Sequence, residues 1–151
     1  MDRKDARDIY SVIQDSFDIK EVDIRTYSPL ALAFMGDCVF DLIIRSIVVG
    51  EGNRQASKLH NKKSQIVKAA TQAAMADAIE GGLLEDEADV YRRGKNAHTM
   101  SKAKNATDMD YHKATGFEAL LGYLYLTHKQ DRIMELVKEA LSRTDGGRYE
   151  I

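Results

Sequence analysis

Apolar residues recur at helical spacing along most of the chain, with polar residues between them. Repeats of three and four residues place such positions on one face of an α-helix. We therefore predict helices over about 4–16, 29–49, 85–93, 110–127 and 130–143, and one with room for a break over about 55–80. No Asn-Gly turn lies between alternating apolar runs, which is the usual mark of a β-hairpin. The pattern predicts an all-α fold.

Local signals mark the start of one helix and a long loop. Ser28 followed by Pro29 is typical of a helix start, because serine caps the first turn and proline suits its first position. Residues 94–109 are rich in Ser, Thr, Asn and Lys and poor in large apolar groups, which predicts a long loop that is either functional or disordered. Asp108 or Asp110 is then expected to cap the next helix.

Three glycines, Gly36, Gly116 and Gly122, lie inside or near the start of predicted helices. A glycine in a helix costs about 1 kcal/mol relative to alanine, and close approach of another backbone is the usual reason for keeping it. Gly36 precedes Asp37, and Gly122 follows Glu118 by one turn. We predict that these two helices cross beside the two acids.

Asp37 and Glu118 lie in the two most apolar stretches of the chain. We expect apolar core residues to surround both acids. Removing a carboxylate from water costs free energy unless a cation or hydrogen-bond donors compensate, so we expect each acid to have such a partner. Two such acids on packed helices are suited to a divalent cation such as Mg²⁺, which keeps several waters. Asp41, one turn after Asp37, lies on the same side of its helix. The alternative is that the acids are simply paired with Arg or Lys.

Size and composition bound the class of protein. The 151 residues fit one domain with one core, and we predict a single domain over 1–151 with no second one. Charged residues interrupt the most apolar run, so no membrane helix is expected. The N-terminus is too charged for a secretory signal, and the single cysteine, Cys38, excludes an internal disulfide. These features predict a cytoplasmic protein.

The net charge is −2, yet basic residues gather in two segments. The segment from Arg54 to Lys68 has five basic residues and no acid, and the segment from Arg92 to Lys113 has six against two acids. Such segments can form a polyanion-binding face in a chain that is nearly neutral overall. Charge alone is equally compatible with an ordinary solvated surface.

Two motifs resemble the catalytic domain of the ribonuclease III family. The segment Leu-Ala-Phe-Met-Gly-Asp-Cys-Val-Phe-Asp over 32–41 resembles the signature Phe-Leu-Gly-Asp-Ala-Val. The segment Thr-Gly-Phe-Glu-Ala-Leu-Leu-Gly-Tyr-Leu-Tyr-Leu over 115–126 resembles the second acidic helix of the family. The segment Arg-Arg-Gly-Lys-Asn-Ala over 92–97 looks like a loop entrance of the Mini-ribonuclease III subgroup, which is a bare catalytic domain. The resemblance covers about 25–141.

The resemblance implies a homodimeric endoribonuclease that uses Mg²⁺, with Mn²⁺ as a substitute, to hydrolyse double-stranded RNA. Asp37 and Glu118 would be its catalytic residues and metal ligands. Full-length members carry two further carboxylates where this chain has Ala33 and Thr115, a departure that resembles the Mini-III pattern. Asp41 and Thr115 are therefore considered only as supporting residues.

The same resemblance gives the basic segments a role. The expected RNA contacts are Arg92, Arg93, Lys95, Asn96, Lys102, Lys104, Lys62 and Lys63, and Phe34 and Met35 match dimer-packing positions of the family. The implied substrate is a precursor of large-subunit (23S) ribosomal RNA, and a ribosomal protein is a candidate partner. Two rival hypotheses are a non-catalytic helical RNA-binding or ribosome-assembly protein and a homodimeric interaction module.

Overall fold

The computed structural model describes residues 8–97 and 106–144. Within them the chain forms helices and no strands, which confirms the predicted all-α class. The elements are α1 (Ile9–Phe17), the 3-10 turn η2 (Ile24–Thr26), α2 (Pro29–Gly50), α3 (Ala56–Val67), α4 (Ala69–Ile79), the 3-10 turn η3 (Glu80–Gly82), α5 (Glu85–Lys95), α6 (Ala106–Leu126) and α7 (Gln130–Arg143). No helix in these two ranges is long and apolar enough to cross a bilayer.

Helix boundaries follow the local signals where those signals are strong. The Ser28 hydroxyl oxygen accepts a hydrogen bond from the N–H of Ala31 at 3.1 Å, and Pro29 occupies the first position of α2. The helix predicted over 55–80 is divided in two, because the backbone at Lys68 is extended. A helix does form over 130–143.

Both ends of the loop predicted over 94–109 lie in helices, and its middle part, 98–105, is outside the described residues. Helix α5 continues to Lys95, and α6 begins at Ala106. Asp108 and Asp110 therefore lie inside α6 and do not cap it. Composition was misleading here, because small, polar and basic residues also suit an exposed helical turn.

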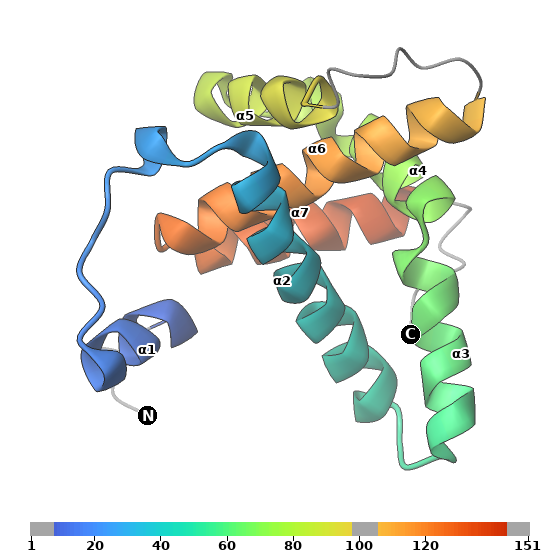
Figure 1. The fold of residues 1–151 in the computed structure, drawn as a ribbon. Helices are drawn as coiled ribbons and strands as arrows, with labels where there is room; N and C mark the ends of the chain where they lie inside the picture. Colours follow the sequence, from blue (N-terminus) through green and yellow to red (C-terminus); the bar gives the residue numbers. More distant parts are fainter. Residues whose placement is uncertain (1–7, 98–105, 145–151) are drawn as a thin grey trace.

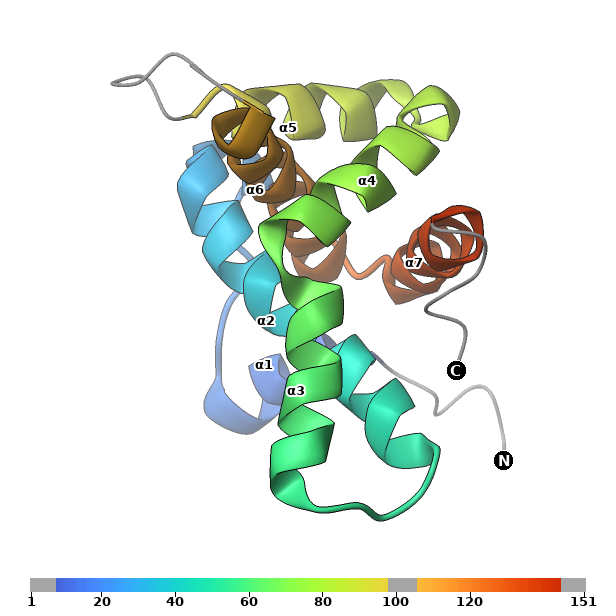
Figure 2. The same cartoon turned by 90° about the vertical axis from the view of Figure 1, so that its right-hand side faces the viewer.

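Helix α6 lies at the centre of the fold. Helix α2 crosses it, α5 and α7 lie on opposite sides of it in Figure 1, and α4 packs along it in Figure 2. Its residues Phe117, Leu120 and Leu124 are fully buried, and the Phe117 ring meets Phe40 of α2 edge-on with 5.4 Å between centroids. Each such side chain contributes about 1.5–3 kcal/mol of burial free energy. Residues carried by α2 and α6 are thus held by the core.

Two glycines bring α2 and α6 into backbone contact, as predicted. A Cβ atom added to Gly36 would lie 1.6 Å from the carbonyl oxygen of Glu118. A Cβ atom added to Gly122 would lie 1.9 Å from the carbonyl oxygen of Leu32. Only glycine permits this distance between the two backbones, so the crossing point is fixed at Glu118.

A second close crossing joins α5 to α6. A Cβ atom added to Gly94 would lie 2.7 Å from the Cβ of Ala119, and one added to Gly116 would lie 2.7 Å from the carbonyl oxygen of Tyr91. The end of α5, which carries several expected RNA contacts, is therefore packed directly on the helix that carries Glu118.

Candidate active site

The crossing of α2 and α6 places two carboxyl groups side by side. Asp37 follows the crossing glycine of α2, and Glu118 is the residue of α6 that this glycine touches. The Asp37 side chain lies within hydrogen-bonding reach of the Glu118 carboxyl group. Two acids that are 81 residues apart in sequence thus converge on one point.

The two acids differ in their exposure to solvent. Glu118 is half-buried, but Asp37 is exposed, so the expectation that core surrounds both acids was wrong for Asp37. The apolar run around Asp37 leaves one side of α2 open to solvent, and the sequence does not show which side is covered. The pair therefore combines a fixed carboxylate with one that a ligand from solution can reach.

Burial and the neighbouring acid make Glu118 retain its proton. Loss of water around the carboxyl group, the hydrogen bond with Asp37 and the negative charge of Asp37 raise the pKa of Glu118 to about 8. A divalent cation placed between the two groups would remove the repulsion and replace that proton. The acid pair thus has a physical reason to bind a cation.

The donor set fits Mg²⁺. Both groups are carboxylates, which are the hard oxygen ligands that Mg²⁺ prefers, and Mg²⁺ completes its shell with water and substrate phosphate. Among the described residues, no cluster of three or more His, Cys, Asp and Glu side chains is arranged to hold a metal ion. Asp37 and Glu118 could supply two carboxylate groups to one ion.

Asp41, one turn after Asp37 on α2, is paired with two cations. Its carboxylate accepts from Arg45 Nε at 2.7 Å and lies 3.3 Å from Lys63 Nζ. Two cations, Arg45 on α2 and Lys63 on α3, therefore neutralise its negative charge. The contact links α3 to the turn of α2 that follows Asp37, and the supporting role of Asp41 stays a prediction.

Thr115 is buried one turn before Glu118, and its hydroxyl donates to the carbonyl oxygen of Tyr111 at 3.0 Å. The hydroxyl thus points back along its own helix, as threonine commonly does in a helix interior. Thr115 therefore directs its hydroxyl group to its own helix, and its supporting role stays a prediction.

The expected RNA contacts form two described groups. Arg92, Arg93, Lys95 and Asn96 lie at the C-terminal end of α5, and Lys62 and Lys63 lie on α3. Several of these cations contact other groups in the free protein: Arg92 with Asp89, Lys95 with the Tyr91 ring at 5.4 Å, and Lys62 with Glu51 at 2.7 Å. The remaining two, Lys102 and Lys104, lie outside the described residues.

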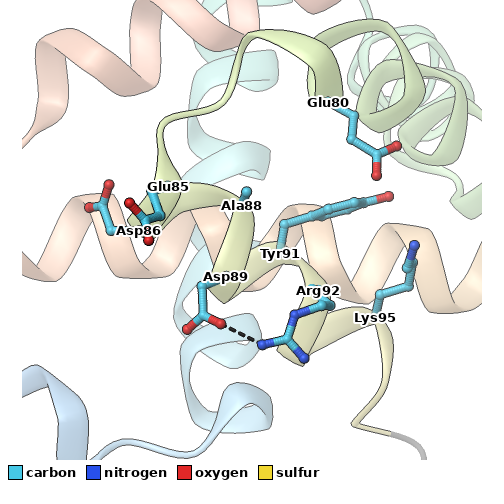
Figure 3. A pocket seen from close by; sticks show the side chains of 8 residues that line it. All are labelled: Glu80, Glu85, Asp86, Ala88, Asp89, Tyr91, Arg92 and Lys95. Carbon is cyan, nitrogen blue, oxygen red and sulfur yellow. Dashed lines mark hydrogen bonds and ion pairs between the residues drawn. The ribbon is translucent and has the colours of Figure 1, made fainter.

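A wide cavity of about 880 Å³ lies elsewhere, on the outer face of α5 (Figure 3). Arg92 and Lys95 line it together with four acids, Glu80, Glu85, Asp86 and Asp89. Neither Asp37 nor Glu118 belongs to its lining. Because this cavity contains neither acid of the crossing, the acid pair is the better candidate for chemistry.

Sequence reasoning missed a second acid that the fold buries. Glu87 of α5 is 1% exposed, and its carboxylate accepts from Arg132 of α7 at 2.8 and 2.9 Å. It also accepts from the N–H of Leu84 at 2.9 Å at the start of α5. The only available signal was a glutamate in the first turn of a predicted helix, which does not identify a partner 45 residues away.

Comparison with known proteins shows the family. Residues 30–129 match the Ribonuclease III domain family. The chain belongs to the ribonuclease III family. It is similar to Mini-ribonuclease 3 of Clostridium tetani, with 39% identity over 117 residues, 77% of this chain and 78% of the relative. It is also similar to Mini-ribonuclease 3 of Streptococcus pneumoniae, with 35% identity over 127 residues, 83% of this chain and 99% of the relative.

A solved structure gives the same result at the level of the fold. The crystal structure of protein FN1578 from Fusobacterium nucleatum superposes with a TM-score of 0.69 at 32% identity, covering 79% of this chain and 96% of that chain. As a ribonuclease III, the chain is an endoribonuclease, of a family that acts on double-stranded RNA and generally depends on divalent metal. The acid pair lies within the matched residues.

Proposed function

We propose that this ribonuclease III is a Mg²⁺-dependent enzyme, with Mn²⁺ as a substitute, in which Asp37 and Glu118 are the catalytic metal ligands. We further propose that it acts as a cytoplasmic homodimer with a single domain over 1–151, and that it matures the precursor of large-subunit (23S) ribosomal RNA. A ribosomal protein bound to that RNA would belong to the same complex. The observation that carries the proposal is the convergence of the two carboxyl groups at the glycine crossing.

The two acids would have different tasks. When bound, Mg²⁺ supplies an activated water and stabilises charge on the scissile phosphate and the leaving oxygen. Half-buried Glu118 fixes the position of the ion, and exposed Asp37 leaves room for a phosphate from solution. Gly36 and Gly122 fix the separation of the two helices and thereby keep both carboxylates within reach of one ion. Burying the Glu118 carboxyl group next to a second acid costs free energy, and a protein without catalytic activity would gain nothing in return.

Binding of RNA would use the two basic groups beside the site. Double-stranded RNA is recognised mostly through its shape, phosphates and 2′-hydroxyl groups. Arg92 and Lys62 are paired with acids in the free protein, so phosphates would replace Asp89 and Glu51 as their partners. Such contacts release counterions, and duplex binding should therefore weaken steeply with salt.

The proposed homodimer is supported by an apolar stripe on α2. Phe34 is 82% exposed, and Leu30, Cys38 and Leu42 are also exposed at four-residue spacing on the same helix. Met35 is partly buried and packs against the protein's own core, so of the two expected dimer positions Phe34 is the better placed. A large aromatic side chain left in water is a typical feature of an interaction site.

We expect the purified protein to cut a long RNA duplex when Mg²⁺ is present and to leave it intact when a chelator is added in excess. Electrophoresis of the products checks this, with single-stranded RNA of the same length as the control substrate. Equal cleavage in chelator would contradict the metal-dependent proposal. Preference for a 23S precursor over an unrelated duplex, mapped by the ends of the products, tests the assigned substrate separately.

We expect Mg²⁺ to stabilise the fold more strongly at pH 8.5 than at pH 6.5. The folded-state pKa of Glu118, about 8, is above its ordinary value, so the stability contributed by the proton is lost as pH rises through about 8. Above that pH the ion replaces the proton without competition. Thermal unfolding with and without Mg²⁺ at the two pH values measures the difference. A shift that persists unchanged in Glu118→Gln would place the ion elsewhere.

A further inference from the structure

Helix α1 has an apolar side that nothing in the described chain covers. Ile9, Val12 and Phe17 are 53%, 42% and 74% exposed, and Gln14 is the one buried residue of the helix. A helix of nine residues is too short to be stable in water by itself. Its position must therefore come from specific contacts, and its apolar side is left available for a partner.

Those contacts converge on His128, just after the end of α6. Asp8 caps α1 by accepting from the N–H of Ser11 at 2.7 Å, and its carboxylate lies 3.1 Å from His128 Nδ1. The Ser11 hydroxyl lies 3.0 Å from the same nitrogen, and Glu21 contacts Nε2 on the other side of the ring. The backbone of His128 is left-handed, with φ +63°, in the turn that leads out of α6.

Aromatic rings complete the group of contacts that holds α1. We call this group the His128 seat; it consists of His128 with Asp8, Tyr10, Ser11, Glu21 and Tyr125. The Tyr10 ring stacks on His128 with 5.1 Å between centroids, and it packs against Tyr125 at 5.0 Å. Polar and aromatic contacts, rather than burial of the apolar side of α1, therefore fix the helix. Figure 1 places α1 beside the C-terminal end of α6.

The seat also connects α1 to the apolar stripe of α2. Tyr125 packs on Tyr10, and burial raises its pKa, with smaller contributions from nearby Tyr10, Asp8 and Cys38. Cys38 is exposed and stands between Phe34 and Leu42 on the stripe. Tyr10 of α1 and Cys38 of the α2 stripe thus both lie near Tyr125.

We propose that α1, seated on His128, is an arm of the contact surface between two copies of this chain, continuous with the α2 stripe. The inference rests on the proposed homodimer and extends its surface. A stable interface buries about 800 Å² on each partner, which is more than one stripe of four side chains provides. A symmetric dimer uses the same patch twice, so apolar side chains meet apolar side chains. RNA is a poor occupant, because α1 carries the acids Asp15 and Asp18 at its end rather than cations.

The test compares a double variant with a single-substitution control by sedimentation. The double variant Ile9→Ser/Val12→Ser alters only exposed side chains, so the fold is kept, and we expect the dimer dissociation constant to rise at least about tenfold, equivalent to 1.4 kcal/mol. The matched control is Met134→Ser, an equally exposed apolar residue on α7, which should leave the constant unchanged. An unchanged constant in the double variant would overturn the arm.

A third variant separates this inference from the homodimer itself. Phe34→Asp should produce monomers if the α2 stripe is the interface. Should the wild type already be monomeric, the proposed homodimer fails and the arm fails with it. A dimeric wild type, a monomeric Phe34→Asp and an unaffected Ile9→Ser/Val12→Ser would keep the homodimer and reject the arm.

The His128 seat gives the surface a pH dependence that a purely apolar contact would lack. Hydrogen bonds to Glu21 and Asp8 raise the pKa of His128 above 6.5, so the contribution of its cation is complete below 6.5 and is lost as pH rises through the folded value. The charged groups around it are Asp8, Glu21, Lys129, Asp131 and Arg132. We expect the dimer to weaken over that rise, and His128→Asn, which tolerates the left-handed backbone, to remove the dependence. A wild-type dissociation constant that does not change with pH would exclude a link between protonation of His128 and dimerisation.

Discussion

Asp37→Asn and Glu118→Gln are each expected to reduce cleavage of an RNA duplex at least about a hundredfold to a thousandfold, the loss typical of removing one preorganised electrostatic group. Each substitution keeps the shape of the side chain and removes one of two ligands, so the remaining carboxylate holds Mg²⁺ too weakly at a single contact. The rate of cleavage under single-turnover conditions measures the effect. A well-folded variant that cuts at the wild-type rate would exclude its acid from the site.

The same substitutions should not damage the fold. Above about pH 8, where Glu118 loses its proton in the absence of metal, Asp37 and Glu118 repel one another, and Asp37→Asn relieves that repulsion and lowers the pKa of Glu118 toward its ordinary value. The thermal midpoint of Asp37→Asn should therefore equal or exceed that of the wild type without Mg²⁺. Glu139→Gln is the matched control, because it removes an exposed carboxylate from α7 and leaves the acid pair intact. It should cut normally.

The buried ion pair Glu87–Arg132 shows what a structural acid looks like in this fold. Glu87 is neutralised by a guanidinium and by a backbone N–H, and its pKa is lowered by the hydrogen bonds with Arg132. Glu118 has the opposite environment, since its neighbour is another acid and its pKa is raised. The hypothesis of two acids merely paired with arginine therefore describes Glu87 and does not describe the pair at the crossing.

The crossing could be predicted from the sequence because its signals are local. A glycine beside Asp37 and another one turn after Glu118 are each costly in a helix, and close backbone packing explains both. The start of α2 at Pro29 was equally readable, because serine and proline have strong positional preferences. These features depend only on residues close together in the sequence, and the structure confirms both of them.

Other features depend on contacts between distant residues. The exposure of Asp37 follows from which side of α2 the core covers, and the apolar pattern of α2 extends around most of the helix. The seat of α1 joins Asp8 to His128 across 120 residues, with no motif at either end. The early start of α6 at Ala106 was hidden by residues that suit a loop as well as a helix.

Gly36→Ala is expected to destabilise the protein by about 3 kcal/mol or more, at the upper end of the range for overpacked sites. The added methyl group would lie 1.6 Å from the carbonyl oxygen of Glu118, and neither backbone can yield without moving a whole helix. Gly81→Ala is the matched control, since nothing lies within 4 Å of its Cβ position. That variant should be neutral or gain up to about 1 kcal/mol from reduced freedom of the unfolded chain. Denaturant unfolding measures both free energies.

The fraction of Gly36→Ala that still folds should also lose activity. The clash falls on the backbone of the residue that carries one metal ligand, so any shift that relieves it moves Glu118 away from Asp37. Loss of one divalent site should then appear as a weaker stabilisation by Mg²⁺ than in the wild type, measured at equal folded concentration. A Gly36→Ala protein with wild-type stability and wild-type response to Mg²⁺ would show that the helices can separate without cost. The two carboxylates could then not owe their convergence to the glycine crossing.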